Sequence, residues 1–153
     1  MIGSGVGFAP SIGGGIAISF GTELFNPPTP VNIPAVLSEG TRIRLVLIPT
    51  GSRFHVNFKA GNDIALHFNP RFDESALVFN STKGGSWQAE ERHPQPLQEG
   101  RVFTVEFVPE DGILKVLING VPTIDFVERI PSHEVSQIEV GGDVHVHSAH
   151  VTH

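Results

Sequence analysis

A two-residue alternation of polar and apolar side chains recurs along this chain in short segments separated by turn-forming residues. The segment 53–58 (RFHVNF) shows it most cleanly, and Asn119-Gly120 is a strong hairpin signal between two further segments. Successive side chains of a strand point to opposite faces, so each segment offers one face to a core. No convincing long amphipathic helix interrupts the series. The chain is therefore predicted to be all-β, a two-sheet antiparallel β-sandwich.

The expected strands follow one another with short connections. They are the segments 31–37, 41–48, 53–58, 63–68, 76–81, 102–108, 113–118, 121–127, 137–140 and 143–151. Pro34 cannot donate to a ladder, so the first of these is expected at a sheet edge. Pro70 is expected to mark a bulge or a strand end for the same reason. One helical turn is expected at 131–136, with Ser132 as its N-cap.

The first thirty residues differ from the rest because they are rich in glycine and proline and carry few charges. One interpretation is a mobile tail or linker. The other is an added strand or a self-association segment, with 15–20 (GIAISF) as the candidate strand. Its apolar side chains are costly to leave in water. The predicted organisation is a tail or extra strand at 1–30 and one domain at 31–153.

Composition excludes several classes of function. The formal net charge is -6 and no basic run is present, so no nucleic-acid partner is expected. The chain has no cysteine and hence no disulfide or thiolate chemistry. No stretch is long and apolar enough for membrane insertion. The first Lys or Arg is Arg42, so the N-terminus lacks the basic region of a signal peptide.

Polar side chains gather between residues 67 and 92 at strand spacing. The segment 67–71 places a histidine, an asparagine and an arginine two residues apart. The segment 90–92 has the same two-residue spacing between a glutamate and an arginine. Between them stands Trp87, the only tryptophan. Each alone would more often be structural, and the charged groups also suit an ion-pair network. Together, planar donors and acceptors beside an indole suit the hydroxyl rim and C–H face of a pyranose.

The pattern H-x-N-x-R, V-x-N, W-x-x-E-x-R resembles the carbohydrate-recognition domain of galectins, most of all the single domains of invertebrate and tandem-repeat members. The resemblance extends from about Val31 to the C-terminus. It implies a jelly-roll, concanavalin-like topology and a non-enzymatic lectin for β-galactosides such as lactose and N-acetyllactosamine, without cofactor. The matching positions are His67, Asn69, Arg71, Val78, Asn80, Trp87, Glu90 and Arg92.

The resemblance also implies roles for these residues. It implies that His67, Asn69 and Arg71 bind the axial 4-hydroxyl of galactose, and that Asn80 and Glu90 bind the 6-hydroxyl. Trp87 would stack on the C–H face of galactose. Glu90 and Arg92, with Arg71, would contact the next sugar. On the neighbouring predicted strand, Arg53, His55 and Asn57 face the same way and are candidates for a subsite that contacts a longer glycan.

Two other functions stay open. A glycosidase usually needs two carboxylates at the scissile bond, whereas only Glu90 is expected on the sugar, held ionised by arginines. A galectin-like fold could instead serve self-association through the N-terminal segment. The family implies a homo-oligomer that cross-links glycoconjugates, and a leaderless protein that is both cytoplasmic and extracellular.

The last predicted strand carries His145 and His147 on one face, followed by two more histidines. Two histidines at this spacing can bind zinc, but no third ligand has an assured place nearby, so no metal is predicted. The preferred interpretation puts these histidines on an outer strand, at a contact between copies of the chain that protonation near pH 6 would weaken.

Overall fold

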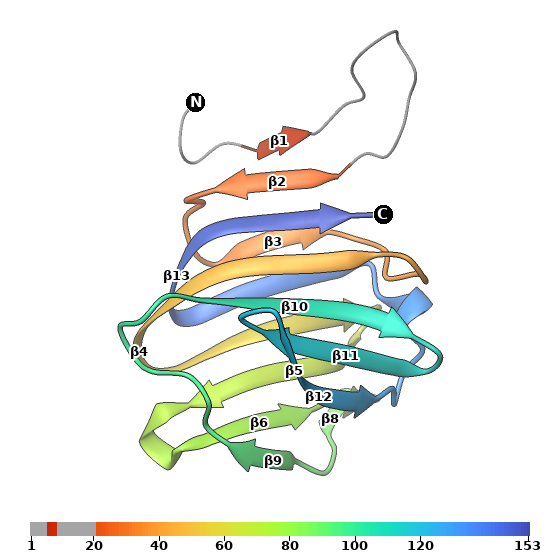
Figure 1. Cartoon of the computed structure of the whole chain (residues 1–153). Helices are drawn as coiled ribbons and strands as arrows, with labels where there is room; N and C mark the ends of the chain where they lie inside the picture. Colours follow the sequence, from red (N-terminus) through yellow and green to blue (C-terminus); the bar gives the residue numbers. More distant parts are fainter. Residues whose placement is uncertain (1–5, 9–20) are drawn as a thin grey trace, which may run out of the picture.

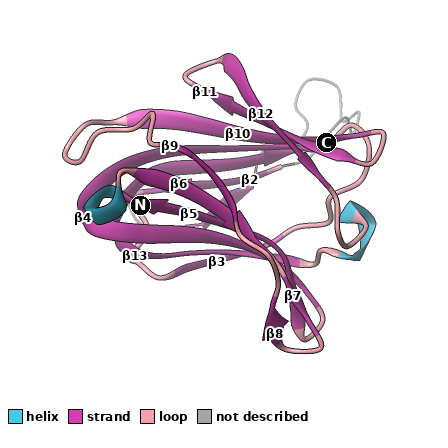
Figure 2. Ribbon diagram, turned by 90° about the horizontal axis from the view of Figure 1, so that it is seen from below, coloured by secondary structure: helices cyan, strands magenta, loops and turns pink. Residues whose placement is uncertain are grey.

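The structure is a computed structural model that describes residues 6–8 and 21–153. Antiparallel strands form two curved layers that face one another (Figures 1 and 2). Within the described part of the chain, the helical segments are two short 3-10 turns, η1 (Phe72–Glu74) and η2 (Ser132–Glu134). No helix among these residues is long and apolar enough to cross a membrane. The predicted all-β sandwich is confirmed, and the candidate strand 15–20 lies outside the described residues.

Two long strands, β4 (Arg42–Ala60) and β13 (Gln137–Thr152), belong to both layers. Each combines two segments that the sequence suggested as separate strands. The register of β13 shifts between Gly142 and Val144, where the strand passes from one layer to the other. Gly142 has a φ of +88°, and a Cβ there would lie 2.8 Å from the Cα of Phe54. Only glycine allows the two strands to approach so closely. The Gly141-Gly142 pair therefore marks a bend within β13 rather than the end of a strand.

The layers extend to either side of β4 and β13. One layer has the order β1-β2-β13-β4-β10-β11-β12, with β1 (Val6–Phe8), β2 (Thr22–Phe25), β10 (Phe103–Glu110), β11 (Ile113–Ile118) and β12 (Val121–Val127). The other has the order β3-β13-β4-β5-β6-β9, with β3 (Val31–Pro34), β5 (Asp63–Arg71), β6 (Ala76–Asn80) and β9 (Glu91–Pro94). A small hairpin of β7 (Thr82–Lys83) and β8 (Ser86–Trp87) follows β6.

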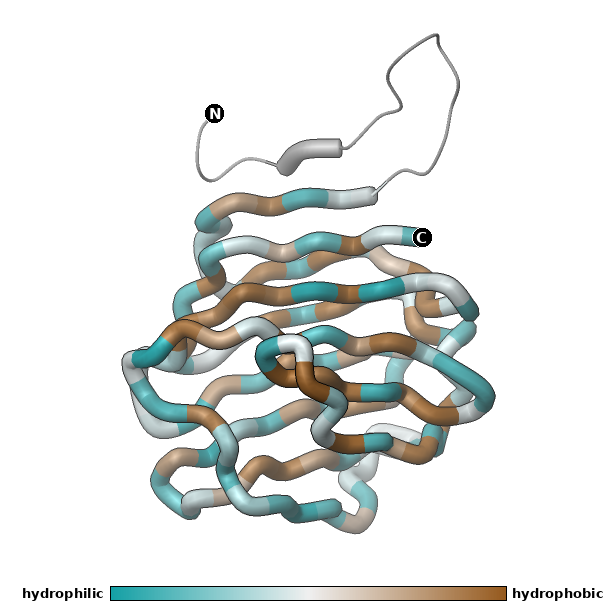
Figure 3. Tube along the Cα trace, viewed as in Figure 1, coloured by the Kyte–Doolittle hydropathy of each residue, from teal (hydrophilic) through white to brown (hydrophobic). Residues whose placement is uncertain are grey.

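Phenylalanine rings fill the space between the layers. Phe68 is fully buried, and its ring centroid lies 5.3 Å from that of Phe107, 5.6 Å from Phe79 and 6.4 Å from Phe54. The alternation of brown and teal along the strands in Figure 3 reflects the two-residue period that sends these rings inward. Because the chain has no disulfide, this apolar burial carries the stability of the sandwich.

Three local expectations need correction. Strand β5 continues through Pro70, which pairs with Leu77 on β6, and ends one residue later. The irregularity in its pairing with β4 lies at Phe58/Lys59 instead. The N-cap of η2 is Pro131, while the hydroxyl of Ser132 donates to Glu128. Finally, the histidine-bearing half of β13 is no outer strand, because it lies between β4 and β2.

Two strands precede the expected domain start at residue 31. β2 pairs with β13, and β1 pairs with the other side of β2 (Figure 1). Leu24 of β2 is only 4% exposed, so this strand contributes to the core as well as to the sheet. The described part of the N-terminal segment thus extends one layer at the end opposite β12.

Candidate functional site

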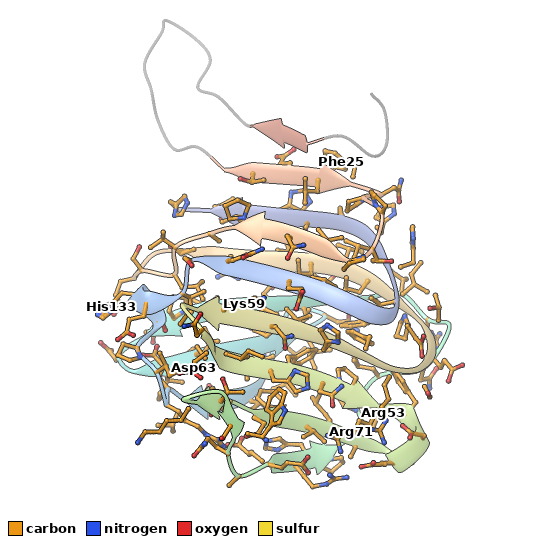
Figure 4. All side chains as sticks on the ribbon, turned by 180° about the vertical axis from the view of Figure 1, so that it is seen from behind. Phe25, Arg53, Lys59, Asp63, Arg71 and His133 are labelled. Atoms are coloured by element: carbon orange, nitrogen blue, oxygen red, sulfur yellow. The ribbon has the colours of Figure 1, made fainter. Side chains whose placement is uncertain are left out.

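A groove of about 600 Å³ crosses the outer face of the layer formed by β4, β5 and β6, beside the β7–β8 hairpin. Its lining comprises Arg53, Phe54, His55, His67, Asn69, Arg71, Asn80, Trp87, Gln88, Glu90 and Gly142. Figure 4 shows Arg53 and Arg71 near one another at one end of this face and Asp63 at the other end. A separate cavity of about 550 Å³ lies behind the hairpin and shares only Gln88 with the groove.

The strand register brings most of the predicted residues together. His67 lies opposite Asn80, and Asn69 lies opposite Val78. Six of the eight matched positions line the groove, and the other two are Val78 and Arg92. Val78 is fully buried and lies directly opposite Asn69 on β5 and Arg92 on β9.

Asn69 is held by the backbone because a proline follows it. The pairing of Arg53 with Arg71 places Pro70 opposite Phe54, and proline has no N–H to give to the ladder. The side-chain amide of Asn69 supplies the missing donor, with its Nδ2 2.7 Å from the carbonyl oxygen of Phe54. Its Oδ1 accepts from Arg71 Nε at 2.8 Å. The proline that interrupts the ladder therefore fixes a groove residue.

The β7–β8 hairpin presents the indole. Asp63 accepts hydrogen bonds from the backbone N–H groups of Gly85 and Gly84 and from the Thr82 hydroxyl, all within 3.0 Å. These bonds, the one from Gly85 foremost, lower the pKa of Asp63. Trp87 is 54% exposed, and its ring centroid lies 4.7 Å from that of His67. The lone tryptophan is thus an exposed wall of the groove rather than a core residue.

Arginines and glutamates form the predicted ion-pair network at the other end of the groove. Arg71 Nη2 lies 3.0 Å from Glu90 Oε2, and Arg92 Nη1 lies 2.7 Å from Glu90 Oε1. The hydrogen bond from Arg92 is the main cause that lowers the pKa of Glu90. The carboxylate therefore stays ionised at neutral pH, with both oxygens already held by guanidinium groups.

Sequence analysis missed two acidic members of this network, Asp73 and Glu74, which lie in η1. Glu74 contacts Arg71 and Arg92 through one oxygen and Arg53 Nη2 through the other, at 2.6 Å. Asp73 accepts from Arg53 Nε at 3.1 Å. The pKa values of both carboxyl groups are lowered by these arginines. Three arginines that needed counter-charges were the signal that could have identified them.

Asn80 is also fixed by residues outside the recognised pattern. Its Nδ2 donates to the carbonyl oxygen of Gln88 at 3.0 Å. Its Oδ1 accepts from the backbone N–H of Ser81 at 2.8 Å and from Arg129 Nη1 at 3.2 Å. The amide oxygen thus has two donors, while the nitrogen keeps one N–H for a ligand.

His67 is one of two imidazoles that line the groove, and it is neutral at pH 7. Burial, followed by the charges of His55 and Arg71, lowers its pKa to about 4. Its ring stacks on that of His55 at a centroid distance of 5.8 Å, and burial lowers the pKa of His55 as well. Of the three residues proposed for a longer glycan, Arg53 and His55 line the groove, whereas Asn57 does not line it and is only 8% exposed.

The C-terminal histidines form no metal cluster. Within residues 21–153, no group of three or more His, Asp or Glu side chains is arranged to hold a metal ion. His145 Nε2 lies 3.2 Å from Asn26 Oδ1, and His150 packs edge-on against the Phe25 ring. Both contacts join β13 to β2 and the residue that follows it.

The groove combines hydrogen-bonding groups of both kinds with one apolar face. Arg71 and Asn80 offer N–H donors, Glu90 and neutral His67 offer acceptors, and Trp87 offers a flat ring. Because the guanidinium groups are compensated by carboxylates, the site favours a neutral polyhydroxylated ligand over a phosphate.

Known proteins share this fold and sequence. The profile of the family described as "Galactoside-binding lectin" matches residues 28–151. Human galectin-7 is 41% identical over 133 residues, covering 82% of this chain and 98% of galectin-7. Rat galectin-4 is 38% identical over 134 residues, which cover 81% of this chain and 41% of galectin-4. The crystal structure of Caenorhabditis elegans galectin LEC-6 superposes with a TM-score of 0.83 at 57% identity, covering 86% of this chain and 96% of that one. This chain belongs to the galectin family of β-galactoside-binding lectins.

Proposed function

We propose that the groove on β4, β5 and β6 binds lactose- and N-acetyllactosamine-type glycans, and that the protein acts as a non-enzymatic lectin. The observation that carries this proposal is the convergence of His67, Asn69 and Arg71 beside an exposed indole. By resemblance to the family, these three hold the axial 4-hydroxyl of galactose, and Trp87 stacks on its C–H face. Asn80 and the Glu90–Arg92 pair then contact the 6-hydroxyl and the next sugar.

A hydrolytic function is disfavoured by the state of the carboxylates. A glycosidase needs a carboxylic acid that is protonated at working pH, together with a base or nucleophile. Arginine hydrogen bonds lower the pKa values of Glu90 and Glu74. Neither is then available as a general acid at neutral pH. Incubation with lactose is expected to release no galactose, and measurable release would overturn this part of the proposal.

The configuration at carbon 4 gives the sharpest test of the sugar. Lactose and cellobiose differ only in the orientation of the 4-hydroxyl on the terminal sugar. The equatorial hydroxyl of cellobiose would leave partially buried polar groups unpaired, at a cost of about 1–3 kcal/mol per group. Calorimetric titration should give a Kd of about 0.01–1 mM for lactose and at least tenfold weaker binding for cellobiose. Equal affinities would contradict the assignment of the 4-hydroxyl.

Lactose affinity is expected to be insensitive to pH in the neutral range. His67 has a pKa of about 4, below its ordinary value of 6.5, so it accepts a proton only near the lower value. Protonation removes its acceptor lone pair. The stability linked to the low pKa is present above pH 6.5 and is lost as pH falls from 6.5 to about 4, because the unfolded chain takes up the proton first. The charged groups around it are Arg71, Glu90 and, if protonated, His55. Lactose titrations across this pH range check this, with circular dichroism at each pH to show that the protein is folded. A loss of lactose affinity with a midpoint near pH 6.5 would contradict it.

Cross-linking requires several groove copies per particle, because each weak site gains strength through multivalency. We propose a homo-oligomer in which residues 1–30 act as an added segment and 31–153 as the carbohydrate-recognition domain. Light scattering of the full chain and of a variant lacking residues 1–20, which keeps β2, tests this. The full chain is expected to have a mass greater than that of one copy, and the variant is expected to have the mass of one copy. A monomeric full chain would contradict the proposal. A cytoplasmic and extracellular localisation stays a prediction from the family.

A further inference from the structure

Three polar side chains lie directly opposite one another on three adjacent strands. Glu139 of β13 pairs with Asn57 of β4, and Asn57 pairs with His67 of β5. Asn57 Nδ2 lies 3.1 Å from Glu139 Oε1, and Asn57 Oδ1 lies 2.5 Å from His67 Nδ1. The three residues therefore form a hydrogen-bonded chain that runs across the sheet and ends at the groove.

The carboxylate of Glu139 sets the orientation of the Asn57 amide. An ionised carboxylate can only accept hydrogen bonds, so it requires the amide nitrogen of Asn57 on its side. The reverse orientation would place two oxygens face to face. Because Asn57 is only 8% exposed, water has little access to relieve that repulsion. The amide oxygen is thus directed toward His67.

The amide oxygen in turn decides which nitrogen of His67 carries the proton. An amide oxygen can only accept, so the Nδ1 that contacts it must be protonated. In the neutral imidazole the other nitrogen, Nε2, then has a free lone pair. A histidine in this tautomer acts as a hydrogen-bond acceptor through the atom that is left for a ligand.

We propose that Glu139 and Asn57 are positioning residues that hold His67 in the Nδ1–H tautomer, so that its Nε2 accepts the proton of the galactose 4-hydroxyl. This inference rests on the proposed function of the groove and goes beyond it by assigning the orientation of His67 to Glu139 and Asn57, neither of which lines the groove. It also gives Asn57 a role through His67, in place of direct contact with a longer glycan.

The neighbours of His67 complete this arrangement. Arg71 uses one N–H each on Nε, Nη1 and Nη2 for Asn69, Glu74 and Glu90, and a guanidinium has five. Two N–H groups therefore remain for a ligand. A hydroxyl that accepts from Arg71 and donates to His67 satisfies both residues at once.

The experiment measures the tautomer of His67 and the affinity for lactose separately. Nitrogen-15 NMR of the imidazole rings in the sugar-free full chain reports which nitrogen of His67 is protonated. The wild type is expected to show Nδ1–H. Asn57→Leu removes the acceptor at similar volume, so Nδ1–H should no longer dominate and lactose affinity should fall about tenfold. Gln137→Ala, two residues before Glu139 on β13, is the matched control and should change neither.

Two further measurements keep the outcome decisive. If Asn57→Leu does not fold, Glu139→Ala leaves Asn57 free to reverse and should give a mixture of tautomers. With wild-type protein, 4′-deoxy-4′-fluorolactose, which carries fluorine in place of the galactose 4-hydroxyl, should bind at least tenfold more weakly than lactose, because fluorine cannot donate to Nε2. An Nε2–H tautomer in the wild type, or an unchanged tautomer in both Glu139→Ala and Asn57→Leu, would overturn the inference. Absence of lactose binding by the wild type would instead overturn the proposed function and, with it, the sugar role of this chain.

Discussion

Replacement of Arg71 by methionine is expected to weaken lactose binding severely. The Arg71 guanidinium donates to Asn69, Glu74 and Glu90, and its side chain is only 16% exposed. Its removal takes away ligand donors and leaves two partly buried carboxylates with fewer partners. Truncation of such a hydrogen-bonded charge costs about 2–5 kcal/mol, which corresponds to a loss of roughly 30-fold to several thousandfold in affinity. Calorimetric titration with lactose measures this loss.

Arg71→Lys is expected to lose nearly as much lactose affinity, because an ammonium group cannot reproduce the planar guanidinium group that contacts three partners. The matched control is Arg42→Met, which removes an arginine from the other layer, where it pairs with Glu106 at 2.7 Å. That variant should bind lactose as the wild type does. Binding by Arg71→Lys within about threefold of wild type would contradict the role of the planar guanidinium group.

Replacement of Trp87 by alanine is expected to weaken lactose binding by about 1.5–3 kcal/mol, or roughly ten- to hundredfold. The indole is 54% exposed in the free protein, so a ligand that stacks on it removes apolar surface from water. The same exposure means that the fold depends little on the ring, and thermal stability should change by less than about 0.5 kcal/mol. Lys83→Ala, in the same hairpin, is the matched control. A large loss of stability in Trp87→Ala would show that the ring is structural.

The faces of the groove strands could be predicted because side-chain alternation is a local property of an extended chain. It correctly sent Phe54, Phe58 and Phe68 inward and the neighbouring polar residues to the groove face. The matched pattern added Trp87, whose exposure no local rule predicts. Local geometry and family pattern together thus yielded the central groove residues.

Long-range contacts could not be predicted in the same way. Glu74 lies in a short connection, and only the folded sheet brings it between Arg53, Arg71 and Arg92. Arg129 reaches Asn80 from 49 positions away in the chain. Such partners depend on strand register and layer crossing, which alternation does not encode.

The same limit explains the misplaced last strand. The alternation of β13 was visible, but its neighbours were not, because β2 comes from a segment whose composition suggested a tail. Pairing with β2 makes the C-terminal half of β13 an interior strand. Its histidines consequently contact residues of this chain, such as Asn26, rather than standing at a free edge.

The most direct test of the account is a calorimetric titration of the wild type and Trp87→Ala with lactose, side by side. The account predicts saturable binding by the wild type, with a Kd of about 0.01–1 mM, and at least tenfold weaker binding by a Trp87→Ala protein that melts at the same temperature. No heat from the wild type, or equal affinity of the two proteins, would contradict the claim that this groove is the β-galactoside site.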